Sequence, residues 1–277
     1  MDNSDFNFLA DLVKRRSGMV LSEDNAYLLQ TRLQPVLRQC RMVAIDDLMQ
    51  DLKQPDNENL ARMVTEAMAT NETMFFRDAE IFDQFQNMVL PRLIESRDET
   101  RSIRIWSAAC ASGQEPYSLA MILKEQFDEI EDWTTEIIAT DLSSSLLEKA
   151  RAGLYSQIEI QRGLPIKKLT RHFTQSGDQW EIDALLREMV HFGALNLMGD
   201  PSTVGKCDVI FCRNVLVYFD LPTKRKVLSG LASCLAEDGV LFLGSAETVL
   251  GVSELFKPLA TGRGMYVHAA SAEQSSA

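Results

Sequence analysis

The chain has 277 residues, a length that suits two domains better than one, because domains average roughly 150 residues. Apolar residues make up 45% of it, enough for a sizeable core, and no apolar run approaches the ~20 residues that cross a bilayer. The net charge of −12 argues against binding nucleic acid through bulk charge, since phosphate binding needs a basic surface. The opening residues, MDNSDFNF, are acidic where a secretory signal is basic, so we expect a soluble cytoplasmic protein.

The five cysteines and three histidines show no metal-ligand pattern. No CxxC pair occurs, and the histidines are far apart in the sequence, whereas a zinc site needs clustered thiolates or imidazoles. We therefore expect no metal, and reduced cysteines that pack as small apolar residues.

The first third of the chain predicts helices only, because apolar residues recur at helical spacing in successive stretches. Ser22 is a candidate N-cap for the second helix, and Asn57 can cap a fourth that runs to about residue 70. Pro35 lies inside the second helix and should kink or restart it. We expect an all-helical N-terminal domain over residues 1–76.

After a further helix at about 79–96, short β-rich runs alternate with helical stretches: RSIRIWSAA, TTEIIATD, KCDVIFCRN and DGVLFLGSAE. This alternation is typical of a parallel sheet with crossover helices. It is interrupted over about 155–188, where FTQSGDQWEI predicts a hairpin around residues 176–177. We expect an α/β domain over 77–270 with a small inserted β subdomain, then a flexible tail over 271–277.

Ligands of open α/β sheets bind beyond the carboxyl ends of the strands, so these ends are informative. The first strand runs into AACASGQEPYSLA, whose single glycine disfavours a pyrophosphate cradle. Glu115 in this turn either accepts bonds from an amine or caps the next helix. Asp141 ends the second strand, where an adenosine ribose is bound in nucleotide-binding folds. Because Ser143 can cap the following helix, a ligand role for Asp141 is favoured.

The third strand ends in CRNVLVYF, which places Arg213 and Asn214 directly after a buried run. Tyr218 lies one helical turn beyond Asn214, and spacing alone favours a core aromatic there. Before the sheet, TNETMFFRDAE places polar side chains at the junction of the two regions: Asn71, Thr73 and Arg77. From the residues alone, Thr73 could instead cap the next helix.

Three arginines and no acid lie between residues 25 and 45: Arg32, Arg38 and Arg41. Arg38 and Arg41 fall on the face opposite the apolar stripe of the second helix. Such charges are usually a solvated helix face. On an acidic protein they are also a candidate docking site for an acidic partner.

Taken together, these motifs resemble the CheR family, the chemotaxis receptor methyltransferases that use S-adenosylmethionine. NETMFFRD, IWSAACASGQEPYSLA, ATDLSSSLLEKARAGLY, ALNLM, FCRNVLVYFD and GVLFLGSAE occur in family order over nearly the whole chain. The resemblance implies a helical N-terminal domain joined to a Rossmann-like methyltransferase domain with an inserted antiparallel β subdomain. It also implies methyl transfer to the γ-carboxylate of receptor glutamates, giving methyl esters and S-adenosylhomocysteine.

The resemblance assigns the cofactor site to nine residues: Asn71, Thr73, Arg77, Glu115, Asp141, Asn196, Leu197, Arg213 and Asn214. Within this set Asp141 suits the ribose hydroxyls, and Asn196 with Leu197 would lie beside the adenine. Arg77 and Tyr218 match the family residues that act near the transferred methyl. A glutamate is already ionised at pH 7 and can attack a sulfonium methyl without a general base, so the scarcity of histidine fits this reaction.

The resemblance also implies that methylation helices of chemoreceptors dock on basic residues of the second helix, where Arg32 and Arg38 fall at matching positions. With Arg41 from the charge pattern, these three arginines are the predicted docking residues. The inserted subdomain of some relatives binds a peptide at the receptor C-terminus. The hairpin loop QSGDQ is short here, which favours no dependence on that peptide. We expect a monomer that neither binds nucleic acid nor inserts into the membrane.

Three alternatives stay open at this point. The first is a methyltransferase with another substrate, for example RNA or a small molecule; the net charge of −12 and the lack of an aromatic, basic groove weigh against RNA. A catalytically silent adaptor of the same fold would be expected to carry degenerate motifs. An NAD-type oxidoreductase is disfavoured by the missing glycines and by the lack of an evident hydride-site residue. Transfer of a labelled methyl group separates the enzymes from the adaptor, and cofactor competition separates a methyl donor from a dinucleotide.

Overall fold

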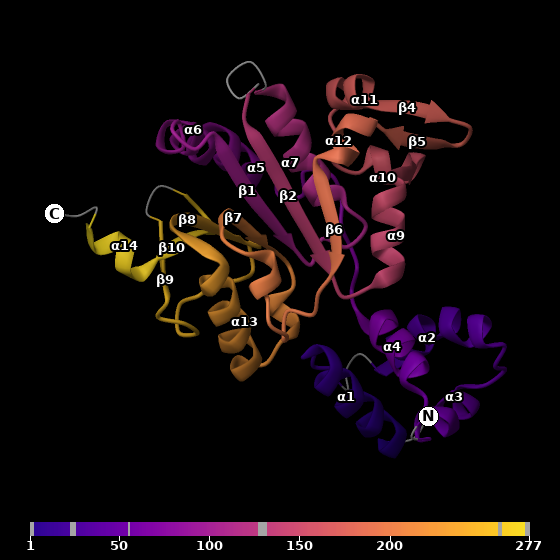
Figure 1. Ribbon diagram of the computed structural model, residues 1–277. Helices are drawn as coiled ribbons and strands as arrows, with labels where there is room; N and C mark the ends of the chain where they lie inside the picture. Colours follow the sequence, from indigo (N-terminus) through magenta and orange to yellow (C-terminus); the bar gives the residue numbers. More distant parts are fainter. Residues whose placement is uncertain (1–2, 23–25, 55, 127–131, 260–261, 275–277) are drawn as a thin grey trace. The chain divides into compact units, whose positions relative to one another are not determined.

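The computed structural model describes residues 3–22, 26–54, 56–126, 132–259 and 262–274 (Figure 1). The chain divides into two compact units. The helical unit consists of Met1–Thr70 with Tyr218–Lys224, and the sheet unit consists of Asn71–Val217 with Arg225–Ala277. The predicted boundary lies at residue 76, six residues after Thr70, and no pattern in the sequence indicates that residues 218–224 return to the helical unit. No helix in the described ranges is long and apolar enough to span a bilayer.

Four helices form most of the helical unit: α1 (Asn3–Ser17), α2 (Ala26–Cys40), α3 (Ile45–Leu52) and α4 (Glu58–Met68). Helix α4 packs against both α1 and α2, and α3 packs against α2. Their inward stripes are buried, with the most enclosed side chains being Leu9, Val13, Leu33, Leu48 and Val64. Burial of these stripes is the main source of stability for such short helices.

Helix continuity and capping differ from the prediction in two places. Helix α2 runs through Pro35 as one helix, with the exposed ring on its outer face, so the predicted restart is wrong. Asn57 does occupy the N-cap position of α4, but its side chain donates to the carbonyl of Asp51 and accepts nothing from the helix. The predicted cap at Ser22 would act on residues 23–25, which lie outside the described residues.

The sheet unit is built on seven strands in the order β6-β2-β1-β7-β8-β10-β9. The first five are mutually parallel: β6 (Val190–Ala194), β2 (Thr134–Asp141), β1 (Ser102–Ala108), β7 (Cys207–Cys212) and β8 (Leu235–Leu243). Strand β10 (Met265–His268) runs antiparallel to β8, and β9 (Phe256–Pro258) runs antiparallel to β10. The five parallel strands are the predicted α/β sheet, and the two antiparallel strands at its edge, β10 and β9, were not predicted.

Helices connect and cover these strands (Figure 1): α7 (Gln114–Glu125), α9 (Ser144–Ala152) and α13 (Leu221–Cys234). The helix predicted at 79–96 is α5 (Ala79–Gln84), a π-helical segment (Phe85–Val89) and α6 (Leu90–Ser96) in direct succession. Pro91 at the start of α6 has no N–H for the regular ladder, which accounts for the wider turn before it. Inside the unit, the rings of Phe211 and Phe242 stack with centroids 4.5 Å apart.

The inserted subdomain is a three-stranded antiparallel sheet in the order β3-β5-β4: β3 (Leu154–Ser156), β4 (Phe173–Ser176) and β5 (Gln179–Ile182). Short helices flank it: α10 (Gln157–Gln161), α11 (Ile166–His172) and α12 (Ala184–Glu188). The β4–β5 hairpin turns where the sequence predicts it, with Gly177 at φ 63°. A last helix, α14 (Ala269–Gln274), takes up part of the predicted tail.

Candidate active site

The carboxyl ends of β1, β2 and β7 form one edge of the parallel sheet, and several predicted polar residues gather there. In register, Ala108 at the end of β1 lies between Thr140 of β2 and Cys212 of β7. Asp141 is the last residue of β2, and Arg213 directly follows β7. The sheet therefore brings together residues that are far apart in the sequence.

The turn from β1 into α7 is buried and tightly wound. Ala109, Ala111 and Gly113 have φ of 61°, 49° and 90°, a left-handed region that glycine enters freely and that is uncommon for alanine. The Cys110 N–H donates to the Thr140 carbonyl at 2.9 Å, which fixes the turn against β2. A side chain at Gly113 would lie 3.0 Å from Cβ of Ala150. The small residues thus let the backbone run close to its neighbours and leave no bulky side chain in the turn.

Asp141 is buried and connects the ends of two strands. Its Oδ2 accepts the Ala111 N–H at 2.8 Å, and its Oδ1 accepts the Ser143 N–H at 2.8 Å. The hydroxyl of Ser143 accepts the Leu146 N–H and so caps α9, as predicted. Asp141 is therefore not the cap of that helix, and its carboxylate is held in the turn that precedes α7.

Asn196 and Leu197 follow β6, the strand that pairs with β2. Asp141 is in register with Ala194, and the Leu195 N–H donates to the Asp141 carbonyl at 3.0 Å. The side-chain oxygen of Asn196 accepts the Met198 N–H at 3.0 Å, which closes a turn there. The structure therefore brings this pair to the same edge of the sheet as Asp141.

Arg213 is the most enclosed charge at this edge, with a side chain only 2% exposed. Its Nη1 donates to Glu115 Oε2 at 2.9 Å, and its Nη2 donates to Asp78 Oδ2 at 2.7 Å and to the Arg77 carbonyl at 2.7 Å. The guanidinium also lies over the Phe82 ring, 5.5 Å from its centroid. The carboxylates of Glu115 and Asp78 thus compensate the buried charge of Arg213. Removing either carboxylate would raise the free-energy cost of keeping the guanidinium buried.

Glu115 does not act as a helix cap, which was the alternative interpretation. It lies in the first turn of α7, yet its Oε1 accepts the hydroxyl of Ser107 at 2.8 Å while Oε2 accepts from Arg213. The side chain is therefore part of the polar cluster at the carboxyl edge and links β1 to the residue after β7.

Asn214 is held by a residue that sequence reasoning missed. Its φ is 59°, and its N–H donates to Glu247 Oε2 at 2.8 Å. The buried Glu247 carboxylate accepts five backbone N–H groups in total: those of Asn214, Val215, Leu216, Val217 and Gly244. A side chain at Gly244 would meet Asn214 Nδ2 at 2.7 Å, so glycine is needed there. The GSAE sequence after β8 is the only sequence signal of this arrangement.

The segment before α5 carries three predicted site residues in an irregular conformation. Phe76 and Asp78 have φ of 51° and 57°, and α5 begins only at Ala79, so Thr73 does not cap it. The Phe76 N–H donates to Ser118 Oγ of α7 at 3.0 Å, which fastens the segment to the sheet unit. Arg77 is half-buried and donates to the Glu72 carbonyl at 2.6 Å. Asn71, at the start of the segment, is exposed.

One observation bears directly on whether this edge fits a polar ligand. Among the described residues, Arg213 Nε is a buried donor without a hydrogen-bond partner. A buried unsatisfied donor is costly and rare in a folded protein. Together with the small-residue turn and the Asp141 carboxylate, it favours a site that is completed by a ligand with a polar or carboxylate group.

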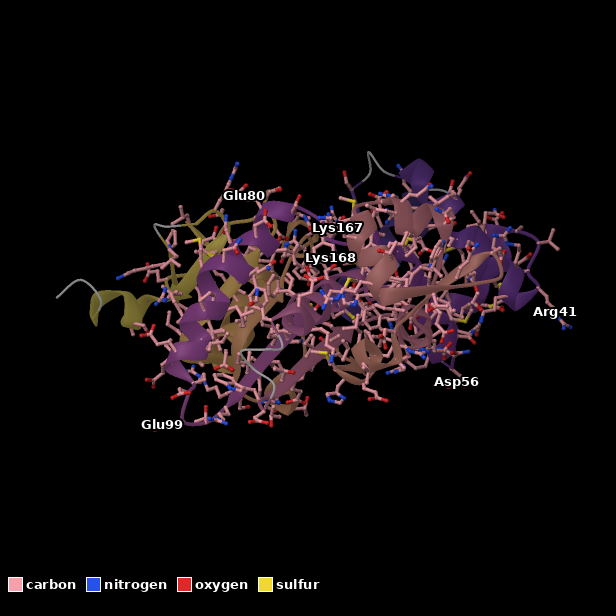
Figure 2. All side chains as sticks on the ribbon, turned by 90° about the horizontal axis from the view of Figure 1, so that it is seen from above. Arg41, Asp56, Glu80, Glu99, Lys167 and Lys168 are labelled. Carbon is pink, nitrogen blue, oxygen red and sulfur yellow. The ribbon has the colours of Figure 1, made fainter. Side chains whose placement is uncertain are left out.

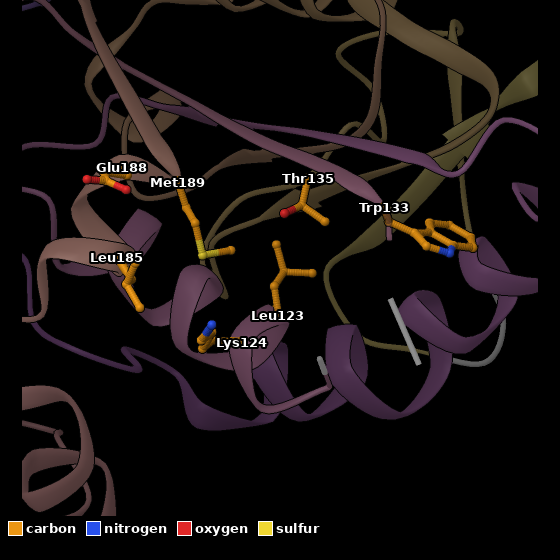
Figure 3. Close-up of a pocket in the computed structure, with 7 residues that line it drawn as sticks. All are labelled: Leu123, Lys124, Trp133, Thr135, Leu185, Glu188 and Met189. Atoms are coloured by element: carbon orange, nitrogen blue, oxygen red, sulfur yellow. The ribbon is translucent and has the colours of Figure 1, made fainter. Parts of the chain in front are cut away.

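The pocket of ≈ 260 Å³ in Figure 3 lies elsewhere. It is lined by residues from the end of α7, the start of β2 and α12: Leu123, Lys124, Trp133, Thr135, Leu185, Glu188 and Met189. Thr135 is the second residue of β2, whereas Asp141 is its last, so this pocket is at the amino end of the strand. Ligands of this fold bind at the opposite end.

Two family descriptions match the chain. Residues 4–68 match "CheR methyltransferase, all-alpha domain", and residues 71–265 match "CheR methyltransferase, SAM binding domain". The chain belongs to the CheR methyltransferase family.

Curated relatives agree with this assignment over nearly the whole length. The chain is 37% identical over 275 residues to Chemotaxis protein methyltransferase 1 of Pseudomonas aeruginosa, covering 96% of this chain and 98% of the relative. It is 34% identical over 272 residues to Chemotaxis protein methyltransferase Cher2 of Pseudomonas putida, with the same coverage of 96% and 98%. A chemotaxis protein methyltransferase of Vibrio parahaemolyticus is 35% identical over 260 residues, covering 93% and 94%.

The predicted family, fold class and enzyme class are confirmed by these matches. The chain is a methyltransferase of the chemotaxis type, with an all-helical N-terminal part and a domain that binds S-adenosylmethionine. The oxidoreductase alternative is wrong, because the sheet unit belongs to a methyltransferase family. Within the described residues no group of His, Cys, Asp or Glu is arranged to hold a metal ion.

The other predicted site residues lie in the helical unit: Tyr218, Arg32, Arg38 and Arg41. Tyr218 is half-buried and belongs to this unit. Arg32 is half-buried, with its guanidinium donating to the Met68 carbonyl at 2.5 Å and to Thr70 Oγ1 at 2.7 Å. Arg38 and Arg41 are exposed, and Figure 2 shows Arg41 projecting away from the ribbon just after α2. Of the three docking arginines, Arg32 thus has a structural partner, while Arg38 and Arg41 face outward.

Proposed function

We propose that this protein transfers the methyl group of S-adenosylmethionine to side-chain carboxylates of glutamates in the methylation helices of chemoreceptors. The products are the glutamate methyl ester and S-adenosylhomocysteine. The proposal rests on the CheR family match and on one structural observation, the cluster of Asp141, Glu115 and Arg213 at the carboxyl edge of the sheet.

The chain's own residues would hold the cofactor in three ways. Asp141 would accept hydrogen bonds from the ribose hydroxyls, and Asn196 with Leu197 would lie along the adenine. Arg213, with its spare buried donor, would bind the carboxylate end, and Glu115 would face the amino group. Asn71, Thr73, Arg77 and Asn214 would complete the site. Bound S-adenosylmethionine supplies a methyl group on a positively charged sulfur, which makes a good leaving group.

The acceptor needs orientation more than acid–base help. A glutamate carboxylate has a pKa of about 4.3 in water and is an anion at pH 7. Arg77 and Tyr218 would orient this anion and displace its water, because in-line placement and desolvation lower the barrier. Neither should bind it too tightly, since ground-state stabilisation slows the attack. The absence of a histidine among the assigned residues is consistent with such a step.

Receptor docking would use the outward arginines of α2 and the turn after it. Arg38 and Arg41 are exposed on a chain of net charge −12, so they form a local basic surface that an acidic receptor helix can recognise. We further propose that the enzyme acts as a cytoplasmic monomer and does not depend on a receptor C-terminal peptide.

The decisive experiment is transfer of a radiolabelled methyl group from S-adenosylmethionine to a purified cytoplasmic receptor fragment. We expect base-labile label, as methyl esters give, and none on a fragment whose methylatable glutamates are replaced by alanine. Tight binding of S-adenosylmethionine without transfer to any receptor fragment would instead favour the silent adaptor. Label that is stable in base would indicate a different acceptor group.

A further inference from the structure

The segment Tyr218–Lys224 belongs to the helical unit although it directly follows a loop of the sheet unit. The Val217 N–H is held by Glu247 Oε1 at 3.3 Å, within the sheet unit. The carbonyl of the next residue, Tyr218, accepts the Val20 N–H at 2.9 Å, within the helical unit. The passage from one unit to the other therefore takes place at the residue to which the family assigns a role near the methyl group.

The helical unit holds this segment through a short strand-like pairing. Helix α1 ends at Ser17, and Gly18, with φ 80°, turns the chain out of the helix. Met19 then forms an antiparallel bridge with Phe219, and both side chains are buried. The carbonyl of Tyr218 and the residue that follows it are thereby held by Met19 and Val20.

An ion pair fixes the following residue. Lys14 Nζ of α1 lies 2.8 Å from Asp220 Oδ2, while Asp220 Oδ1 accepts the Thr223 N–H at 3.0 Å. The hydrogen bond from Lys14 holds the pKa of Asp220 below its ordinary value and raises the pKa of Lys14. The two side chains are 51% and 30% exposed, so the pair adds little to overall stability.

Tyr218 also lines a small cavity of ≈ 80 Å³ within the helical unit. Arg32 and Thr70 line the same cavity, and they are hydrogen-bonded to each other. One wall of the tyrosine's surroundings is thus set by α2, the helix proposed to dock the receptor.

We propose that the Lys14–Asp220 ion pair and the Met19–Phe219 bridge are positioning elements for Tyr218. These contacts would fix the position of Tyr218, the residue proposed above to orient the acceptor carboxylate. This inference rests on the role proposed above for Tyr218.

The test compares Lys14→Met with Arg16→Met in the full chain, using receptor fragment and S-adenosylmethionine. Both variants remove an ion pair of α1: Lys14 pairs with Asp220 in the Tyr218 segment, whereas Arg16 pairs with Glu58 at 2.6 Å. For Lys14→Met we expect kcat about fivefold lower at saturating substrates, because small misplacements of an orienting group slow transfer. The cofactor Kd should stay within about twofold, and Tm should shift by less than about 2 °C. Arg16→Met should leave kcat unchanged.

Two further variants separate positioning from general weakening. Lys14→Arg keeps the charge and should restore kcat. Asp220→Asn keeps an acceptor for the Thr223 N–H and should reproduce the loss seen with Lys14→Met. In a Tyr218→Phe background, Lys14→Met should have almost no further effect, because both changes act through one hydroxyl.

The outcomes distinguish a failure of the positioning inference from a failure of the proposed function on which it rests. If Tyr218→Phe lowers kcat but Lys14→Met behaves like Arg16→Met, the positioning inference is overturned and the proposed function stands. The same conclusion follows if the effects of Lys14→Met and Tyr218→Phe multiply independently. If Tyr218→Phe leaves kcat unchanged while methylation proceeds, Tyr218 has no role near the methyl group and the inference falls with that role.

Discussion

At the scale of single residues, the carboxylates of Asp141 and Glu247 have similar environments but different proposed roles. Both are buried and accept backbone N–H groups, so both stabilise loops. Asp141 ends a strand at the edge that we propose binds the cofactor, whereas Glu247 contacts that edge by holding the loop of Asn214. Substitution of each residue should therefore separate direct binding of the cofactor from support of the loop that carries Asn214.

We expect Asp141→Asn to raise the Kd for S-adenosylmethionine by about tenfold or more, because a hydrogen bond to a charged group contributes ~1.5–3 kcal/mol. Titration calorimetry measures this. The matched control is Asp183→Asn, since Asp183 also accepts the N–H two residues ahead, that of Leu185, but is exposed and caps α12. Equal affinity of the two variants would remove Asp141 from the cofactor site.

Glu247→Gln should destabilise the sheet unit and also weaken the binding of the cofactor. The amide would turn an N–H₂ group toward backbone donors, and each buried donor left unpaired costs about 1–3 kcal/mol. We expect a fall in Tm of at least about 4 °C by calorimetry. Glu254→Gln, a change at an exposed residue of the same unit, should not alter Tm. A Tm for Glu247→Gln equal to that of the unsubstituted protein would show that the loop of Asn214 does not need the carboxylate.

At the scale of elements, the inserted subdomain is joined to the segment before α5 by a close backbone contact. Gly163 has φ 85°, and a Cβ there would lie 2.1 Å from the Phe75 carbonyl oxygen. Phe75 itself is fully buried, with Tyr155 of β3 5.0 Å away in an edge-to-face arrangement. The loop at Gly163 thus has to approach the backbone of the NETMFFRD motif.

Gly163→Ala should therefore lower stability by more than about 2 kcal/mol, the sum of left-handed strain and a steric clash. Gly177→Ala is the matched control, because Gly177 has φ 63° but no atom within 4 Å of the added Cβ. That variant should lose only about 1 kcal/mol. Denaturant unfolding of both variants gives the comparison, and equal losses would show that the Phe75 contact can relax.

The outward face of α2 makes a separate prediction about docking. Arg38→Glu should raise the KM for the receptor fragment and leave the cofactor Kd unchanged, because the residue is exposed and lies in the helical unit. The effect should shrink at 1 M salt, where the screening length falls to about 3 Å. Arg171→Glu, the same charge change on exposed α11, is the control. Unchanged methylation by Arg38→Glu would refute the docking surface.

At the scale of the whole molecule, the five cysteines report on the integrity of the fold. Four are buried and free, and burial raises the pKa of the Cys207 thiol to about 12 and raises those of Cys110 and Cys212 as well. Since the thiolate is the reactive form, iodoacetamide at pH 8 should label the half-buried Cys40 first. Mass spectrometry of the native and denatured protein tests this order. Early labelling of Cys207 would indicate that the sheet unit opens locally.

The sequence predicts the parts of the fold and site that leave a local pattern. Long apolar runs gave β1, β2, β7 and β8, and the polar residue after each run gave Asp141 and Arg213. Strands β9 and β10 have only 3 and 4 residues, too few for a periodic signal. The role of Glu247 could not be predicted, because four of its five partners are backbone groups 30 to 33 residues away. Tyr218 was ambiguous for the same reason, since its environment is set by residues near position 20.

Residues 218–224 belong to the helical unit although they lie between two stretches of the sheet unit in the sequence, and this has a consequence for modularity. A polypeptide that stops at Thr70 would lack Phe219 and Asp220, so Met19 would lose its buried partner and Lys14 its counter-ion. A polypeptide that begins at Asn71 would carry Tyr218 without the residues that hold it. The two units are therefore not interchangeable parts that can be cut apart or grafted at a single point. Recombination between relatives should succeed only when residues 1–70 and 218–224 are inherited together.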